Sequence, residues 1–124
     1  MSIATIRRRL LTAPLLALAL VGSAAGGASA APGCPAGQIC VWRDGPFVGS
    51  SDTYSGELSY HDLRPGSHDE VSSWHNATDT TWCLIDFPDG VTTIRTILDR
   101  LGPGEARGVL PAGANDKADA IERC

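Results

Sequence analysis

The stretch CVWRDGPFV at residues 40–48 recurs in weakened form as CLIDFPDGV at residues 83–91. A second pair of segments follows in the same order, with HDEVSS at residues 68–73 and NDKADA at residues 115–120. The copies are offset by 43 residues in the first pair and by 47 in the second. A repeat near this period indicates one supersecondary unit that stacks on its own copy. The sequence therefore predicts a single domain built from two similar halves.

Short β-rich runs alternate with turn-forming residues along the chain. Branched and aromatic residues predict strands over residues 39–42, 53–60 and 71–74. The turn formers around them are Asp44-Gly45-Pro46, Arg64-Pro65-Gly66 and Pro88-Asp89-Gly90. Strands this short, separated by such turns, are typical of an all-β sandwich or barrel.

Residues 92–101 fit two structures. Ile94, Ile97, Leu98 and Leu101 have the spacing of one helix face. Many residues of the segment are β-branched, however, and β-branching disfavours a helix. The repeat also requires a strand here, so we expect a strand, with a short amphipathic helix as the alternative.

The N-terminal 30 residues resemble a secretory signal peptide. Three arginines at residues 7–9 precede an apolar stretch at 10–21, and Ala-Ser-Ala at 28–30 is a cleavage signature. The apolar stretch is shorter than the roughly 20 residues that span a bilayer. We therefore expect residues 1–30 to be removed and residues 31–124 to form a secreted, monomeric domain that is not held in a membrane.

The predicted exported part is acidic. Without the three N-terminal arginines, seven Lys and Arg residues face 14 Asp and Glu residues, which gives a net charge of −7 with histidine neutral. Nucleic acids and anionic membranes both bind proteins through Lys and Arg that displace counterions. The composition thus argues against both as partners.

All four cysteines lie in the predicted exported part. An even number in a small exported domain predicts two disulfides, and four cysteines allow three connectivities. Proximity favours Cys34–Cys40, which leaves Cys83–Cys124. A zinc site formed by the cysteines is disfavoured because the C-x-x-C spacing is absent.

Two motifs carry a family resemblance. The pattern of Cys40, Trp42, Phe47 and Gly49 resembles the opening of a βγ-crystallin Greek-key motif. The Cys-Pro-x-Gly opening and the ending NDKADAIERC, closed by a cysteine, resemble the peptidase inhibitor I36 family. This resemblance implies a disulfide-held sandwich of two Greek-key motifs, at about residues 34–80 and 81–124. It also implies a secreted inhibitor of extracellular, thermolysin-like metalloproteinases.

The two hexapeptides resemble the calcium loop of the βγ-crystallin superfamily, (N/D)(N/D)xx(S/T)S. The resemblance makes Asp69, Ser72, Asp116 and Asp119 candidate ligands of a calcium ion, because calcium prefers hard oxygen donors. The match is incomplete: His68 replaces the leading Asn or Asp, Asp119 stands where Ser or Thr is expected, and Ala120 replaces the final Ser. The alternative is that both hexapeptides are structural turns.

His61, His68 and His75 are spaced by seven residues, but turns between them and alternating strand faces argue against a metal triad. The sequence has no G-x-S-x-G, no H-E-x-x-H and no Gly-rich phosphate loop, so we expect no enzyme and no required cofactor.

An inhibitor needs an accessible segment that enters the protease cleft. By resemblance to the family, the bond between Cys83 and Leu84 is the candidate, because thermolysin-like enzymes prefer a bulky aliphatic residue after the scissile bond. The alternative is that Leu84 and Ile85 lie in a buried strand. The alternative function is a βγ-crystallin-type calcium-binding or structural module without inhibitory activity.

Overall fold

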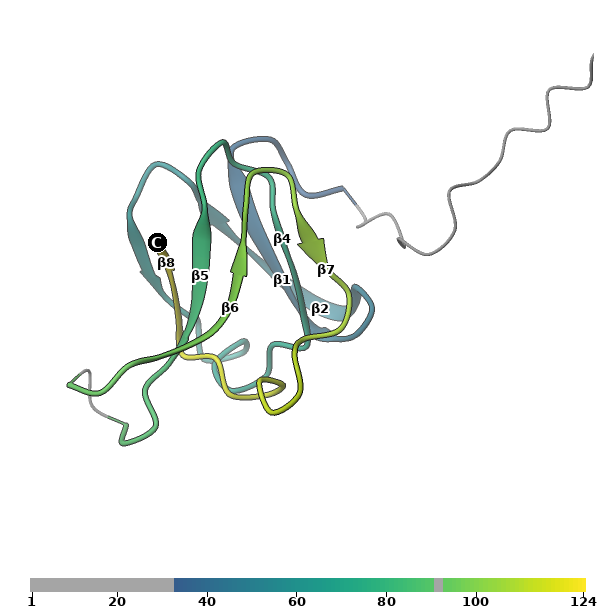
Figure 1. Cartoon of the computed structure of the whole chain (residues 1–124). Helices are drawn as coiled ribbons and strands as arrows, with labels where there is room; N and C mark the ends of the chain where they lie inside the picture. Colours follow the sequence, from purple (N-terminus) through teal and green to yellow (C-terminus); the bar gives the residue numbers. More distant parts are fainter. Residues whose placement is uncertain (1–32, 91–92) are drawn as a thin grey trace, which may run out of the picture.

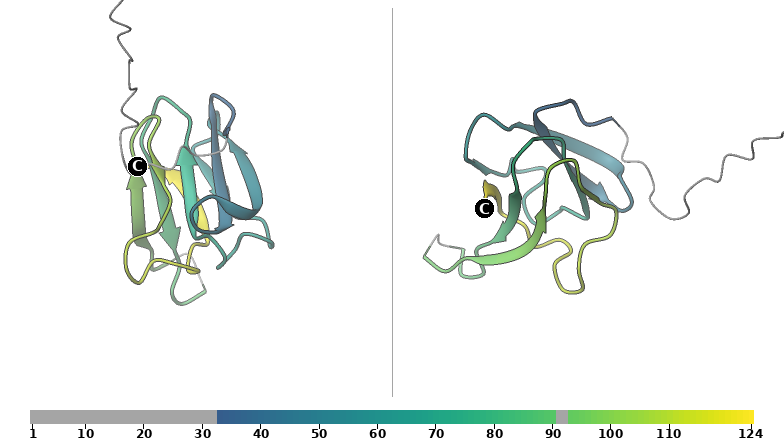
Figure 2. Two further views of the ribbon diagram at one scale, coloured as in Figure 1. Left: turned by 90° about the vertical axis from the view of Figure 1, so that its right-hand side faces the viewer. Right: turned by 45° about the horizontal axis from the view of Figure 1, so that its top comes forward.

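The computed structural model describes residues 33–90 and 93–124, which form two antiparallel sheets packed face to face (Figures 1 and 2). The signal peptide predicted over residues 1–30 lies outside the described residues. The strands are β1 (Gln38–Asp44), β2 (Val48–Ser55), β3 (Tyr60–Asp62), β4 (Ser73–Asn76), β5 (Trp82–Asp86), β6 (Thr96–Leu101), β7 (Ala106–Arg107) and β8 (Ala120–Arg123).

The two sheets have equivalent strand orders. One runs β2-β1-β4-β7 and the other β6-β5-β8-β3. Each sheet therefore contains the first, second and fourth strands of one half of the chain and the third strand of the other half. This exchange interlocks the halves, and it confirms the expected all-β sandwich of two Greek-key motifs.

The structure decides two expectations about individual strands, over residues 53–60 and 92–101. The strand expected over residues 53–60 is wrong, because β2 ends at Ser55 and β3 begins at Tyr60 in the other sheet. The chain crosses between sheets at Gly56, whose amide donates to the Gly37 carbonyl at 2.8 Å. A Cβ at Gly56 would lie 2.6 Å from that same oxygen, so only glycine permits the close approach. Residues 96–101 form strand β6, so the helical alternative is wrong there; residues 91–92 lie outside the described residues.

The hairpin between β1 and β2 is folded over by an aromatic corner. Trp42 and Phe47 make an edge-to-face contact with ring centroids 5.2 Å apart. Phe47 has a φ of 57°, and Gly49 has a φ of 82°. Ser73 fixes this corner, because its hydroxyl accepts from the Phe47 amide and donates to the Asp44 carbonyl, each at 2.9 Å. The motif noted in the sequence is thus a built tertiary feature.

The apolar core lies between the sheets. Its largest fully buried side chains include Trp74, Trp82 and Leu84, with Ile39 and Ile121 from the two facing sheets. Burying a side chain of this size contributes about 1.5–3 kcal/mol, so most of the stability of so small a domain comes from this layer. Trp42 is buried in a separate cluster beside the first disulfide.

The two disulfides lie within single sheets, whereas a partly buried ion pair joins one sheet to the other. Cys34 is bonded to Cys40, and Cys83 is bonded to Cys124, which are the pairs favoured by proximity in the sequence. Asp99 of β6 joins the opposite sheet, since its carboxylate accepts from the Trp74 indole at 3.0 Å and from two nitrogens of Arg107 at 2.9 and 3.1 Å. The carboxylate of Asp99 raises the pKa of the Arg107 guanidinium.

Candidate functional site

The two acidic hexapeptides lie side by side and are paired by symmetric backbone hydrogen bonds. The Asp69 amide donates to the Ala118 carbonyl at 2.8 Å, and the Asp116 amide donates to the Val71 carbonyl at 3.1 Å. Asp69 and Asp116 have φ values of 58° and 59°, in the left-handed region that aspartate tolerates better than most residues. The repeat in the sequence thus becomes a local twofold arrangement of two loops.

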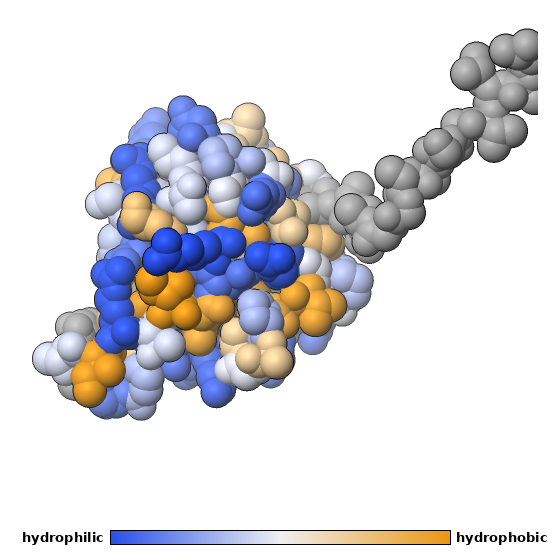
Figure 3. All heavy atoms as spheres, viewed as in Figure 1, coloured by the Kyte–Doolittle hydropathy of each residue, from blue (hydrophilic) through white to orange (hydrophobic). Residues whose placement is uncertain are grey.

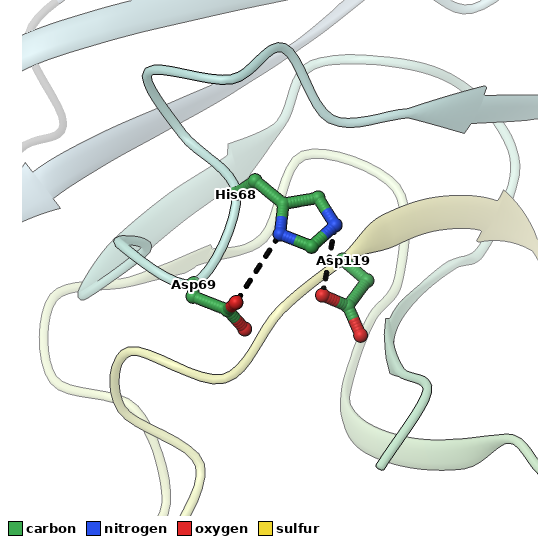
Figure 4. A group of neighbouring side chains, drawn as sticks. All are labelled: His68, Asp69 and Asp119. Carbon is green, nitrogen blue, oxygen red and sulfur yellow. Dashed lines mark hydrogen bonds and ion pairs between the residues drawn. The ribbon is translucent and has the colours of Figure 1, made fainter. Parts of the chain in front are cut away.

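The four candidate calcium ligands divide into two pairs across this interface. In the first pair the Ser72 hydroxyl donates to Asp116 Oδ1 at 3.3 Å. The second pair, Asp69 and Asp119, is bridged by an imidazole (Figure 4). His68 Nε2 lies 3.0 Å from Asp119 Oδ1, and His68 Nδ1 lies 3.2 Å from Asp69 Oδ2.

The second pair is partly enclosed and rich in carboxylates. Asp119 is 5% exposed, and its Oδ2 accepts from the Phe87 amide at 2.6 Å. Burial, and next the neighbouring carboxylate of Asp119, raise the pKa of Asp86 above its ordinary value. A cavity of about 250 Å³ opens beside the pair, lined by Asp62, His68, Phe87, Gly90 and Asp119.

The first pair faces a different cavity. A depression of about 450 Å³ lies beside Ser72 and Asp116, with Arg43 and Glu70 among its lining residues. The side chains of this pair offer only oxygen donors, as calcium prefers. The second pair differs because a nitrogen donor stands at its centre. The sequence analysis identified Asp69, Ser72, Asp116 and Asp119 as candidate ligands, but it did not identify His68 as the residue that bridges two of them. The mismatch of His68 with the loop pattern was the signal that could have identified it.

The three histidines occupy separate places. His61 in β3 donates to the Ser55 carbonyl at 2.6 Å and stacks on Trp82, with centroids 6.0 Å apart. His75 lies in β4 of the opposite sheet. Among the described residues, a metal-ligating group of three forms only around His68.

The candidate reactive bond requires a correction. Cys83 and Leu84 are both 0% exposed, in the middle of β5, which pairs with β6 on one side and β8 on the other. A protease cleft binds an extended segment with accessible main-chain groups, and here those groups are used within the sheet. The bond between Cys83 and Leu84 therefore cannot contact a protease in the folded protein, and Leu84 belongs to the core.

Aliphatic side chains reach the surface elsewhere. The most exposed are Val109 at 76%, Leu58 at 60% and Ile94 at 59%. Ile94 lies in the connection between β5 and β6, which projects from the sandwich at the lower left of Figure 1, where Figure 3 shows hydrophobic surface. The sequence analysis did not identify Ile94 as a surface residue, because the spacing of apolar residues over 92–101 does not show which of them face the solvent.

Described contacts hold both arms of this connection. Arg95 forms an ion pair with Glu122 of β8, and the Thr93 hydroxyl donates to Asp89 Oδ2 at 3.1 Å. On the other arm the Phe87 amide is fixed by Asp119. Ile94 is therefore presented on an anchored projection.

In the part of the chain that the structure describes, no helix has the length and apolar character needed to traverse a membrane.

Comparison with known proteins identifies fold and family separately. A solved structure from work on the evolution of the eye lens βγ-crystallin domain fold shares 23% sequence identity, with a TM-score of 0.55, and the match covers 73% of this chain and 89% of that one. A βγ-crystallin domain from Flavobacterium johnsoniae shares 21% identity, with a TM-score of 0.48, over 68% of this chain and 90% of that one. No curated protein sequence matches the chain.

The sequence profile of peptidase inhibitor family I36 matches residues 27–96. This match covers more than half of the chain and includes all of the first repeat and the start of the second. The chain belongs to peptidase inhibitor family I36, a family of inhibitors and not of enzymes, and it has the βγ-crystallin fold.

Proposed function

We propose that this protein is a secreted, monomeric inhibitor of an extracellular, thermolysin-like metalloproteinase. The observation that carries the proposal is membership of family I36 over residues 27–96. Export is supported by the signal-like N-terminal sequence and by two disulfides, which persist in oxidising compartments. No catalytic group is needed, because an inhibitor acts by occupying the cleft of its target.

The rigidity of the domain supports this mode of action. Binding costs less free energy when the contacting segment is already ordered in the free protein. Here a disulfide joins β5 to the last residue, and β5 lies in the centre of its sheet. A projection from β5 and β6 is therefore attached to a strand that is hydrogen-bonded on both sides and linked by a disulfide.

The segment that we propose for the protease cleft is Thr93–Ile94, in place of Cys83–Leu84. Ile94 is an exposed aliphatic residue of the kind that thermolysin-like enzymes accept after the scissile bond. Its flanking residue Arg95 is held against Glu122. An exposed aliphatic anchor on a supported projection is a suitable central contact for a protease pocket.

A protease panel tests the class of target. The oxidised protein is titrated against thermolysin and, as a control, against a serine protease of the subtilisin type. The proposal predicts stoichiometric inhibition of the metalloproteinase at nanomolar concentration and none of the serine protease. Inhibition of the serine protease alone would place the target in another class.

A matched pair of variants tests the segment. Ile94→Asp should weaken inhibition by about 30-fold or more, the effect of losing a central anchor worth about 2 kcal/mol. Leu58→Asp makes the same chemical change at an equally exposed site in another loop and should leave inhibition unchanged. Equal inhibition by wild type and Ile94→Asp would show that another surface contacts the enzyme.

A second candidate function is a calcium-binding module, and the Ser72–Asp116 pair favours it. These two side chains meet across paired loops at 3.3 Å and offer oxygen donors beside a cavity. If calcium binds there, added calcium should raise the melting temperature of the wild type but not that of Asp116→Asn. An unchanged melting temperature in millimolar calcium would remove this candidate.

A further inference from the structure

The fold family implies calcium at both acidic loops, but the second pair does not suit calcium. Calcium takes six to eight oxygen ligands. At the second pair, a histidine replaces the expected Asn or Asp and its ring lies between the two carboxylates (Figure 4). A nitrogen donor therefore occupies the place of an oxygen donor.

We infer that His68, Asp69 and Asp119 form a binding site for a divalent transition-metal ion of the zinc type, and not for calcium. One ligand atom from each side chain lies within 4.8 Å of the other two. Imidazole nitrogen and carboxylate oxygen are both common zinc ligands, at about 2.0–2.2 Å from the metal. Three such donors can converge on one ion through small side-chain rotations, and water can complete the coordination.

The framework around Asp119 is fixed before any ion binds. The Asp119 amide donates to the Ile85 carbonyl at 2.8 Å, and its carbonyl accepts from the Leu63 amide at 2.9 Å. Its Oδ2 accepts from the Phe87 amide, which orients the carboxylate and leaves Oδ1 facing His68. Outer hydrogen bonds of this kind strengthen a metal ligand because they hold it in place. Asp69 is exposed and free to adjust.

A further carboxylate lies beside the cluster. Asp62 lines the same cavity as His68 and Asp119. Carboxylates gathered beside an imidazole favour a divalent cation, because a bound cation compensates their negative charges.

Metal titration tests the inference directly. Isothermal calorimetry with Zn²⁺ and, separately, Ca²⁺ is run on the oxidised protein in buffers that do not chelate metal. All four cysteines are in disulfides, so thiols do not contribute to zinc binding. We expect one Zn²⁺ per chain at this site, and no Ca²⁺ bound there.

Three variants assign the ligands. His68→Asn restores the loop pattern of an oxygen-only site and should weaken Zn²⁺ binding by about tenfold or more. Asp69→Asn, at an exposed side chain that does not support the fold, should weaken it as well. His61→Gln, in another strand, should have no effect. The imidazole nitrogens of His68 should also shift in ¹⁵N NMR spectra on addition of Zn²⁺.

Two results would overturn the inference. The first is an absence of Zn²⁺ binding at millimolar concentration. The second is Zn²⁺ binding that neither His68→Asn nor Asp69→Asn weakens. Both results are independent of protease inhibition, so they bear on the metal site alone.

Discussion

Removal of the Asp99 carboxylate should destabilise the domain more than any other change at a partly exposed ion pair. Asp99 is 8% exposed and accepts a hydrogen bond from the indole of Trp74, which is fully buried. In Asp99→Ala this buried donor loses its acceptor, which costs about 1–3 kcal/mol. The pair with Arg107 adds at most about 1 kcal/mol, because that guanidinium is 41% exposed and screened by water.

The expected total is about 1–4 kcal/mol of unfolding free energy. For a domain of this size, each kcal/mol lowers the melting temperature by roughly 4–8 °C, so a decrease of at least about 4 °C is expected. Asp99→Asn separates the two terms, since its amide oxygen can still accept from Trp74 while the charge is lost. It should cost about 1 kcal/mol.

Urea unfolding followed by tryptophan fluorescence measures these differences at constant disulfide state. Asp79→Ala, at an exposed aspartate, is the control and should stay within about 0.5 kcal/mol of the wild type. An Asp99→Ala protein as stable as this control would refute the account of the buried network. If Asp99→Ala and Asp99→Asn lost the same free energy of unfolding, the hydrogen bond from the Trp74 indole would not contribute separately from the charge of Asp99.

Two further predictions concern the second disulfide and the carboxyl pair. Replacing Cys83 and Cys124 together by alanine removes a disulfide with a sequence separation of 41 and should lower the free energy of unfolding by roughly 4 kcal/mol. The loss should appear as a lower midpoint of urea unfolding. An unchanged midpoint would show that the disulfide does not stabilise β5. Burial and the Asp119 carboxylate raise the pKa of Asp86, so the folded protein holds the proton of Asp86 more tightly than the unfolded chain does. The stability gained in this way is present below about pH 4, and it is lost as the pH rises through the pKa of Asp86 in the folded protein. Asp86→Asn should therefore stabilise the protein at pH 7 by up to about 1 kcal/mol and have little effect at low pH, in urea titrations with chelator present; a destabilised variant at pH 7 would reverse the sign of this argument.

The fold could be predicted from the sequence because short motifs repeat in the two halves, and their aromatic, glycine and turn-forming residues restrict the local backbone. Gly49 adopts a positive φ value, and because glycine is the usual residue at such a position, the position can be recognised in the sequence. The cysteine pairs follow from proximity. The exchange of β3 and β7 between the sheets depends on long-range pairing. These strands have only three and two residues, so their sequences do not indicate the sheet to which each belongs.

The candidate site was harder to predict because exposure is a property of the assembled sheets. Leu84 and Ile94 are both aliphatic residues near the start of the second half, yet one is 0% exposed and the other 59%. The difference arises because β5 is one of the two inner strands of its sheet, whereas Ile94 lies in the connection that follows it. The pairing of Asp119 with His68 likewise requires residues 51 positions apart to meet, which depends on the contact between loops.

We propose above that this member of family I36 inhibits a metalloproteinase by occupying its cleft. The most direct test is the steady-state kinetics of thermolysin at several substrate concentrations with the oxidised protein as inhibitor. We expect tight competitive inhibition with one inhibitor bound per enzyme, and a small active-site ligand should displace the inhibitor. Inhibition that is indifferent to substrate and to that ligand, or no inhibition at micromolar protein, would contradict it.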